Sequence, residues 1–101
     1  MDATYLVECF WPGVTSDRVE AANTRARAES AALRRQGSSL RFLGSMVIPS
    51  DEVVFFQFMA ASREEVVRAS RQAELPFDRV AAFQWLKPSR GAASQRRTRV
   101  R

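Results

Sequence analysis

The hydrophobic positions of this chain repeat with two different periods, which separate strands from helices. Runs rich in aromatic and β-branched residues predict four strands, at residues 5–11, 40–48, 53–60 and 79–86. Small and apolar residues at helical spacing predict two helices, at residues 16–36 and 62–73. The order βαββαβ is that of the split-βαβ arrangement. We therefore expect an α+β fold with a four-stranded antiparallel sheet and two helices on one face.

Local signals support the helix boundaries. Thr15 or Ser16 can cap the first helix, and Gly37 is a natural stop at its end. Ser62 and Glu65 have the spacing of a capping box, in which each side chain bonds the other residue's free backbone amide. The inward stripe of the first helix is expected to comprise Val19, Ala22, Ala26, Ser30 and Leu33. That of the second is expected to comprise Val66, Ala69, Ser70 and Ala73.

Alternation along each strand divides its side chains between two faces of the sheet. The face without polar residues should pack against the helices, and it carries Tyr5, Val7, Cys9, Trp11, Val54, Phe56 and Phe58. The far face should carry the polar residues Glu8, Arg41, Ser45, Gln57 and Gln84. The same far face also receives large apolar residues, namely Phe10, Leu43, Val47, Val53, Phe55 and Leu86.

This second apolar surface leads to the predicted partner. Two helices can cover only one face of the sheet, so a monomer would leave the far face in water. Exposed apolar patches of that size usually mark an interface or a ligand site. We therefore expect a homodimer that forms through the sheet.

The five polar residues of the far face are the candidate ligand-binding residues: Glu8, Arg41, Ser45, Gln57 and Gln84. An apolar wall with few polar contacts is typical of a small-molecule site, and the leading hypothesis is a non-enzymatic dimer that binds a small molecule or a partner there. A structural interpretation, in which Glu8 and Arg41 form an ion pair at the dimer seam, is favoured for those two residues. An alternative is a cofactor-free oxygenase or isomerase with Glu8 as base and Arg41 holding an anionic group.

The net charge of +5 is distributed unevenly. Residues 87–101 carry six basic side chains and no acid, whereas the first 86 residues hold 10 basic and 11 acidic ones. The composition of residues 87–101 cannot form a core, so we expect a folded domain at 1–86 and a disordered basic tail at 87–101. The tail could associate with nucleic acid through counterion release, but a solubilising role is the simpler interpretation.

The residues most often used in catalysis are scarce. The chain has no histidine and one cysteine, Cys9, which the alternation places toward the helices as a small hydrophobe. No Gly-rich phosphate loop, Ser-His-Asp set or two-histidine metal pattern occurs, so no catalytic residue, metal or cofactor is predicted. Trp11 and Trp85 are expected to be core aromatics or pocket walls. The single cysteine is typical of a protein in a reducing compartment, and the first residues lack the basic region and apolar run of a secretory signal. Both observations favour a cytoplasmic location.

Several stretches resemble a known family. The stretches concerned are Tyr5-Leu6-Val7-Glu8, Leu40-Arg41-Phe42-Leu43-Gly44-Ser45, Ile48-Pro49-Ser50-Asp51-Glu52, residues 60–68 and Leu75-Pro76-Phe77-Asp78-Arg79-Val80. They are similar to an uncharacterised bacterial family of small ferredoxin-like proteins. The resemblance covers about residues 4–86. It implies the ferredoxin-like fold and a dimer whose two sheets pack into an α+β barrel, and some relatives bind nickel.

The chain departs from that family where the metal would be held. Ala69, Phe56 and Met59 stand where relatives often have a histidine, a cysteine and an acid. Nickel is held well by imidazole, and a lone thiol with scattered carboxylates is a poor substitute. Metal binding is therefore not expected of this chain.

Overall fold

The structure, a computed structural model, describes residues 1–89. The elements follow in the order β1 (Ala3–Phe10), α1 (Ser16–Arg35), β2 (Arg41–Ile48), the 3-10 turn η1 (Pro49–Asp51), β3 (Val53–Ala60), α2 (Arg63–Gln72) and β4 (Arg79–Phe83). This order confirms the predicted ferredoxin-like α+β fold.

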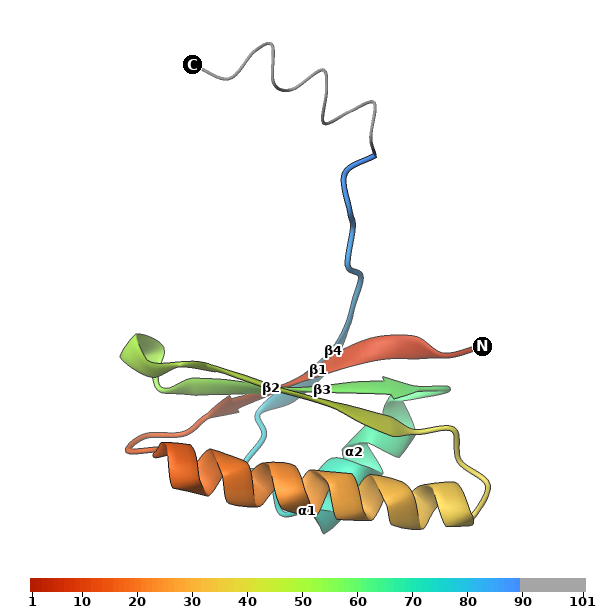
Figure 1. Cartoon of the computed structure of the whole chain (residues 1–101), viewed down its shortest axis with the longest axis horizontal. Coiled ribbons are helices and arrows are strands. Elements are labelled where there is room, and N and C mark those ends of the chain that lie inside the picture. Colours follow the sequence, from red (N-terminus) through yellow and green to blue (C-terminus); the bar gives the residue numbers. More distant parts are fainter. Residues whose placement is uncertain (90–101) are drawn as a thin grey trace.

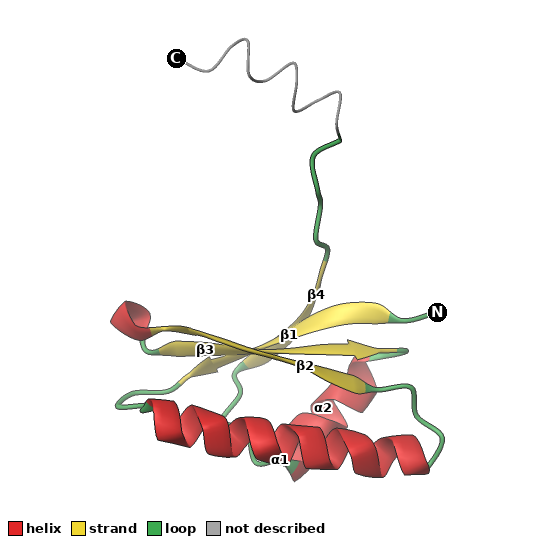
Figure 2. Ribbon diagram, viewed as in Figure 1, coloured by secondary structure: helices red, strands yellow, loops and turns green. Residues whose placement is uncertain are grey.

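The four strands form one sheet in the order β2-β3-β1-β4, and every neighbouring pair is antiparallel. Figure 1 shows both helices on the same side of this sheet. In Figure 2 the opposite side has no helix or strand over it among the described residues. The sheet therefore has a covered face, against the helices, and an open face, a name that we keep below.

The core lies between the covered face and the two helices. Val7 and Cys9 of β1 and Phe56 and Phe58 of β3 are fully buried there. The buried residues of α1 are the five predicted ones, at Val19, Ala22, Ala26, Ser30 and Leu33. Because three of these five residues, Ala22, Ala26 and Ser30, are small, the helix can approach the sheet closely.

Both ends of α1 follow the sequence signals. The Thr15 hydroxyl accepts a hydrogen bond from the Arg18 amide at 3.2 Å, which identifies Thr15 as the cap. At the other end, the Gly37 amide donates to the Arg34 carbonyl and the Ser38 amide donates to the Leu33 carbonyl. This is the Schellman pattern, and Gly37 has the positive φ, 101°, that the pattern requires.

The capping box at α2 is only half formed. The Ser62 hydroxyl accepts from the Glu65 amide at 3.3 Å, as predicted. The Glu65 carboxylate, however, accepts from the Ser38 hydroxyl at 2.9 Å. Ser38 lies far away in the sequence, so local spacing could not reveal it as the competing donor. The contact ties the start of α2 to the loop that follows α1.

A β-bulge in β2 reverses the side-chain alternation of that strand. Phe42 pairs with Phe58, and Gly44 pairs with the next residue of β3, Gln57, so Leu43 is the extra residue. Directly paired residues lie on the same face of a sheet, so every position of β2 beyond Leu43 changes side. Without the bulge, residues 43, 45 and 47 would share one face, as the sequence analysis expected.

Gly44 follows the bulge with φ of 137°, in a region that other residues rarely adopt. A Cβ atom placed there would meet nothing within 4 Å, so any penalty comes from the backbone alone. We expect Gly44→Ala to lower the free energy of unfolding by about 1–3 kcal/mol. Urea unfolding of this variant beside Ser45→Ala, one residue along the strand, measures the effect. Equal small losses in the two variants would contradict the assigned backbone strain.

The structure describes only the first residues of the predicted basic tail. Residues 87–89 belong to neither helix nor strand. The rest of the predicted basic tail, residues 90–101, lies outside the described residues, so its structure stays a prediction. No helix within residues 1–89 is both long and apolar enough to cross a membrane.

Candidate functional site

The open face is a surface of the sheet that the helices leave uncovered. The register places on it, from β2 to β4, the apolar residues Met46, Ile48, Met59, Phe55, Val53, Leu6, Phe10, Ala81 and Phe83. Phe10 is 56% exposed and Met46 is 46% exposed, although both are large hydrophobic side chains. The prediction of a second apolar face is therefore confirmed for the described chain, with a partly different set of residues.

The bulge removes two of the expected members. Ser45 pairs with Phe56 and Val47 pairs with Val54, so both belong to the covered face. The prediction that they lie on the open face is wrong. Gly44 and Met46 take the open positions instead, because one inserted residue exchanges the two faces of a strand. No residue type in β2 marks the bulge, except that Gly44 is compatible with its unusual backbone.

Gln84 is also displaced from the expected face. β4 ends at Phe83, three residues before the predicted end, so Gln84 lies beyond the sheet. Phe83 pairs with Thr4 and Arg79 pairs with Glu8, which fixes the open positions of β4 at the odd-numbered residues. The predicted placement of Gln84 and Leu86 on the open face of the strand is wrong for this reason.

Glu8 has a partner that sequence reasoning missed. Its Oε1 accepts from the Arg79 Nε at 2.6 Å, and the two side chains are 32% and 71% exposed respectively. Spacing along the chain could not reveal this pair, because it depends on how β4 aligns with β1. The Asp78 carboxylate also accepts from the Phe10 amide at 2.6 Å. Together with the ion pair, this bond attaches the start of β4 to β1.

The predicted ion pair between Glu8 and Arg41 does not form within one chain. Glu8 is level with Phe55 of β3, whereas Arg41 is level with Met59. This offset, together with two strand spacings, separates the two Cα atoms by roughly 16 Å. With one carboxylate oxygen already engaged by Arg79, Glu8 is also poorly placed to act as the free base of the enzyme hypothesis. The register places Arg41 at the β2 edge of the open face, as predicted, and Arg41 also lines a pocket with residues of α1.

Gln57 lies in the middle of the open face, as predicted. It pairs with Leu6 on one side and with Gly44 on the other. Gly44 has no side chain and the far neighbour of Leu6 is Ala81, so this row of the sheet is low at its two ends and higher at Gln57 and Leu6 in the middle. The row provides space next to the Gln57 amide when another surface covers the sheet.

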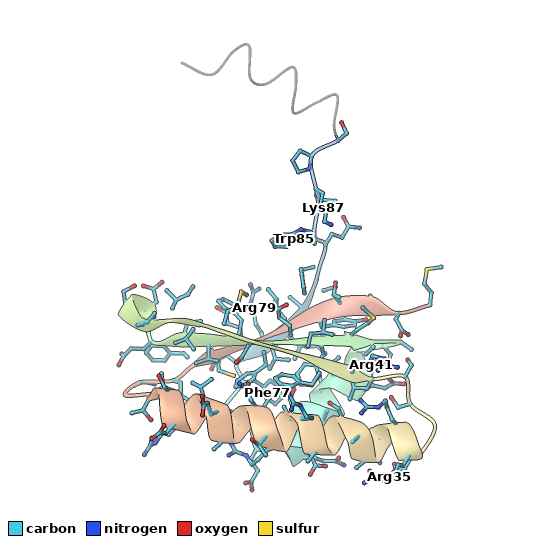
Figure 3. All side chains as sticks on the ribbon, in the orientation of Figure 1. Arg35, Arg41, Phe77, Arg79, Trp85 and Lys87 are labelled. Atoms are coloured by element: carbon cyan, nitrogen blue, oxygen red, sulfur yellow. The ribbon has the colours of Figure 1, made fainter. Side chains whose placement is uncertain are left out.

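An extended segment continues from β4 on the open side. Figure 3 shows residues 84–89 leaving the sheet away from the helices, with Trp85 part of the way along. Trp85 is 79% exposed and Leu86 is 82% exposed, so Trp85 is not a core aromatic. Trp85 does border a cleft of about 400 Å³ together with Asp2, Thr4, Met59 and Phe83. We refer to residues 84–89 as the arm.

Cys9 is buried on the covered face, as predicted. Burial, followed by the nearby Asp78 and Glu8 carboxylates, raises the pKa of its thiol to about 12. A thiol with so little thiolate is a poor nucleophile and a poor metal ligand. Within residues 1–89, no group of three or more His, Cys, Asp or Glu side chains is arranged to hold a metal ion.

Comparison with known proteins adds one structural relative. No family model and no curated protein matches the chain. The crystal structure of SCO4226 from Streptomyces coelicolor A3(2) superposes with a TM-score of 0.65, covering 84% of this chain and 100% of that one at 17% sequence identity. At that identity the likeness extends to the fold alone. The chain therefore shares the ferredoxin-like α+β fold of a small Streptomyces protein.

Proposed function

We propose that this chain acts as a homodimer whose two open faces pack together and enclose a binding site for a small, mainly apolar molecule. The observation that carries the proposal is the open face, where nine apolar residues share one surface with few polar groups. Removing apolar surface from water is favourable by about 25 cal/mol for each Å². A cover therefore stabilises the protein.

A second copy is the cover that fits the shape of the molecule. Four strands at about 4.8 Å spacing and seven residues of length project roughly 400 Å², about half of the 800 Å² per partner that a stable interface usually buries. The arm supplies more area, since Trp85 and Leu86 are almost fully exposed on the same side of the sheet. Two copies related by a twofold axis would each offer an arm and a face that needs covering.

The ligand site would lie where two such sheets leave room. The row of Gly44, Gln57, Leu6 and Ala81 is low at both ends, so two facing copies of it would leave space beside Gln57 and beside Leu6. Gln57 would provide an amide donor and acceptor in that space, and Glu8 with Arg79 a charged pair at its side. An apolar wall with few polar contacts is typical of small-molecule sites.

Met46→Arg tests the dimer. Met46 is 46% exposed in the single chain, so the substitution should leave the protomer folded while it places a charge in the interface. We expect the wild type to sediment as a dimer at micromolar concentration and the variant to raise the dimer dissociation constant at least about a hundredfold. Analytical ultracentrifugation measures both.

Ala21→Lys, on the exposed side of α1, is the matched control, and it should remain dimeric. Native mass spectrometry of the wild type tests the ligand, because a retained molecule would add its mass to the dimer. A wild type that stays monomeric at about 100 μM, well above the dissociation constants of typical stable interfaces, would contradict the proposal.

A further inference from the structure

A second pocket lies at the β2 edge of the sheet, between α1 and the start of β2. It has a volume of about 300 Å³ and is lined by Arg27, Ser30, Arg34, Arg41, Phe42 and Leu43. We name it the arginine pocket. Its three α1 residues are spaced three and four apart, so they lie on one face of the helix. Figure 3 shows Arg41 near the start of β2, beside the C-terminal half of α1.

The pocket brings together three positive charges without a compensating acid. No Asp or Glu lines it, and none of its three arginines forms an ion pair with the rest of residues 1–89. Arg34 uses one nitrogen, Nη1, to donate to the Leu40 carbonyl at 2.9 Å, which fixes its guanidinium at the pocket. The remaining guanidinium donors are available to an anion. The arrangement contrasts with Arg79, whose charge is neutralised by Glu8.

A buried hydroxyl without a hydrogen-bond partner within residues 1–89 belongs to a residue in the wall of the same pocket. Ser30 is fully buried, and its Oγ has no hydrogen-bond partner among the described protein groups. A helical serine often bonds the carbonyl four residues earlier, but Ser30 does not do so. Buried polar groups are rarely left unpaired, because the loss of hydration is not recovered. Ser70 shares this property but lines none of the described pockets, whereas Ser30 forms part of the wall of this one.

The other side of the pocket is apolar and fixed in place. The ring of Phe42 lies 5.2 Å from the ring of Phe58 and 6.3 Å from that of Phe56, measured between centroids. Phe42 is therefore held against the core, while the neighbouring Leu43 is 48% exposed at the bulge. The pocket thus combines a cationic end with a small hydrophobic wall.

We propose that the arginine pocket binds a small phosphate monoester that carries a compact apolar group. A phosphate monoester has a charge near −2 and three oxygens that accept hydrogen bonds. Arginine suits it because the planar guanidinium can donate two parallel bonds. A single carboxylate would leave two of the three positive charges uncompensated. The volume lies at the lower end of the range for small-molecule sites, which favours a compact ligand.

Phenyl phosphate is a suitable probe, and two-dimensional NMR of the full-length labelled chain can follow its binding. We expect saturable shifts centred on residues 27–43. Inorganic phosphate, which lacks the apolar group, and benzoate, which carries one charge, should both bind more weakly. Arg27→Gln and Arg41→Gln should each raise the dissociation constant about tenfold or more, since a hydrogen bond to a charged group is lost. Ser30→Ala should weaken binding without lowering the melting temperature.

Two control variants remove the same charge elsewhere. Arg68 lies on α2 and Arg97 belongs to the basic tail. If binding is local, Arg68→Gln and Arg97→Gln should each change the dissociation constant for phenyl phosphate less than about twofold. Three results would each overturn the proposal. The first is an equal loss of affinity in either control, and the second is benzoate binding as tight as that of phenyl phosphate. The third is a lack of saturation by about 10 mM phenyl phosphate, near the weak limit of useful affinity. All six residues that line the arginine pocket belong to one protomer, so the Met46→Arg variant should bind phenyl phosphate as tightly as the wild type does. The two proposals can thus fail separately.

Discussion

Phe56→Ala is expected to lower the free energy of unfolding by about 3–5 kcal/mol. Phe56 lies in the central strand β3, is fully buried, and contacts the half-buried ring of Phe42. Truncation removes the transfer free energy of the ring and leaves a cavity that the surrounding sheet cannot close, because its neighbours are held in register on both sides. Urea unfolding followed by tryptophan fluorescence and circular dichroism measures the loss.

Phe55→Ala is the matched comparison, since the same side chain is removed from the neighbouring position on the open face. In the single chain Phe55 is only partly buried, so its truncation should cost less than that of Phe56 at low protein concentration. If the open faces pair, the loss for Phe55→Ala should grow as the concentration rises, because the stability of a dimer depends on concentration. If Phe56→Ala does not fold, Phe56→Leu provides a milder version of the same comparison. Equal losses for both positions at every concentration would contradict the assigned covered and open faces.

Cys9 should react with a thiol reagent at pH 8 roughly a thousandfold more slowly in the native protein than in denaturant. Burial, followed by the Asp78 and Glu8 carboxylates, raises the pKa of the thiol from 9.0 to about 12. The raised pKa reduces the thiolate by about three orders of magnitude, and burial restricts access as well. Because the folded pKa exceeds the unfolded one, the associated stability is present below pH 9 and is lost as the pH rises toward 12.

The reaction of Cys9 with Ellman's reagent measures this protection. Cys9→Ala provides the blank, since the chain has no other cysteine. Ala28→Cys in the Cys9→Ala background provides an exposed reference thiol on the outer side of α1. A native rate for Cys9 within about tenfold of that of the reference thiol would show that the thiol is neither buried nor protonated as described.

The helices and the core were predictable because their signals are local. The stripe from Val19 to Leu33 follows from helical spacing, and the stop at Gly37 follows from the need for a positive φ. The central strand β3 was also predictable, as a run rich in β-branched and aromatic residues, and in the structure its buried positions alternate without interruption. For these segments, local preference and tertiary packing favour the same structure.

The candidate site was predicted less well because it depends on register. A single extra residue, Leu43, moves Ser45 and Val47 to the covered face, and nothing in the local pattern distinguishes a bulge from a regular strand. The partner of Glu8 is 71 residues away, and its identity depends on how β4 aligns with β1. The arginine pocket likewise combines one helix with the start of a distant strand, which spacing along the chain cannot show.

The extra residue in β2 has a further consequence, for protein aggregation. Within residues 1–89, β2 and β4 are the outermost strands, so each has a row of backbone amides and carbonyls with no described strand beyond it. The irregular register at Leu43 interrupts this row on β2, and β4 provides only five residues before the chain leaves the sheet. An incoming strand would find no long, regular template on either side. Both edges therefore disfavour growth into fibres by strand addition, and they leave the open face as the surface for the dimer proposed above.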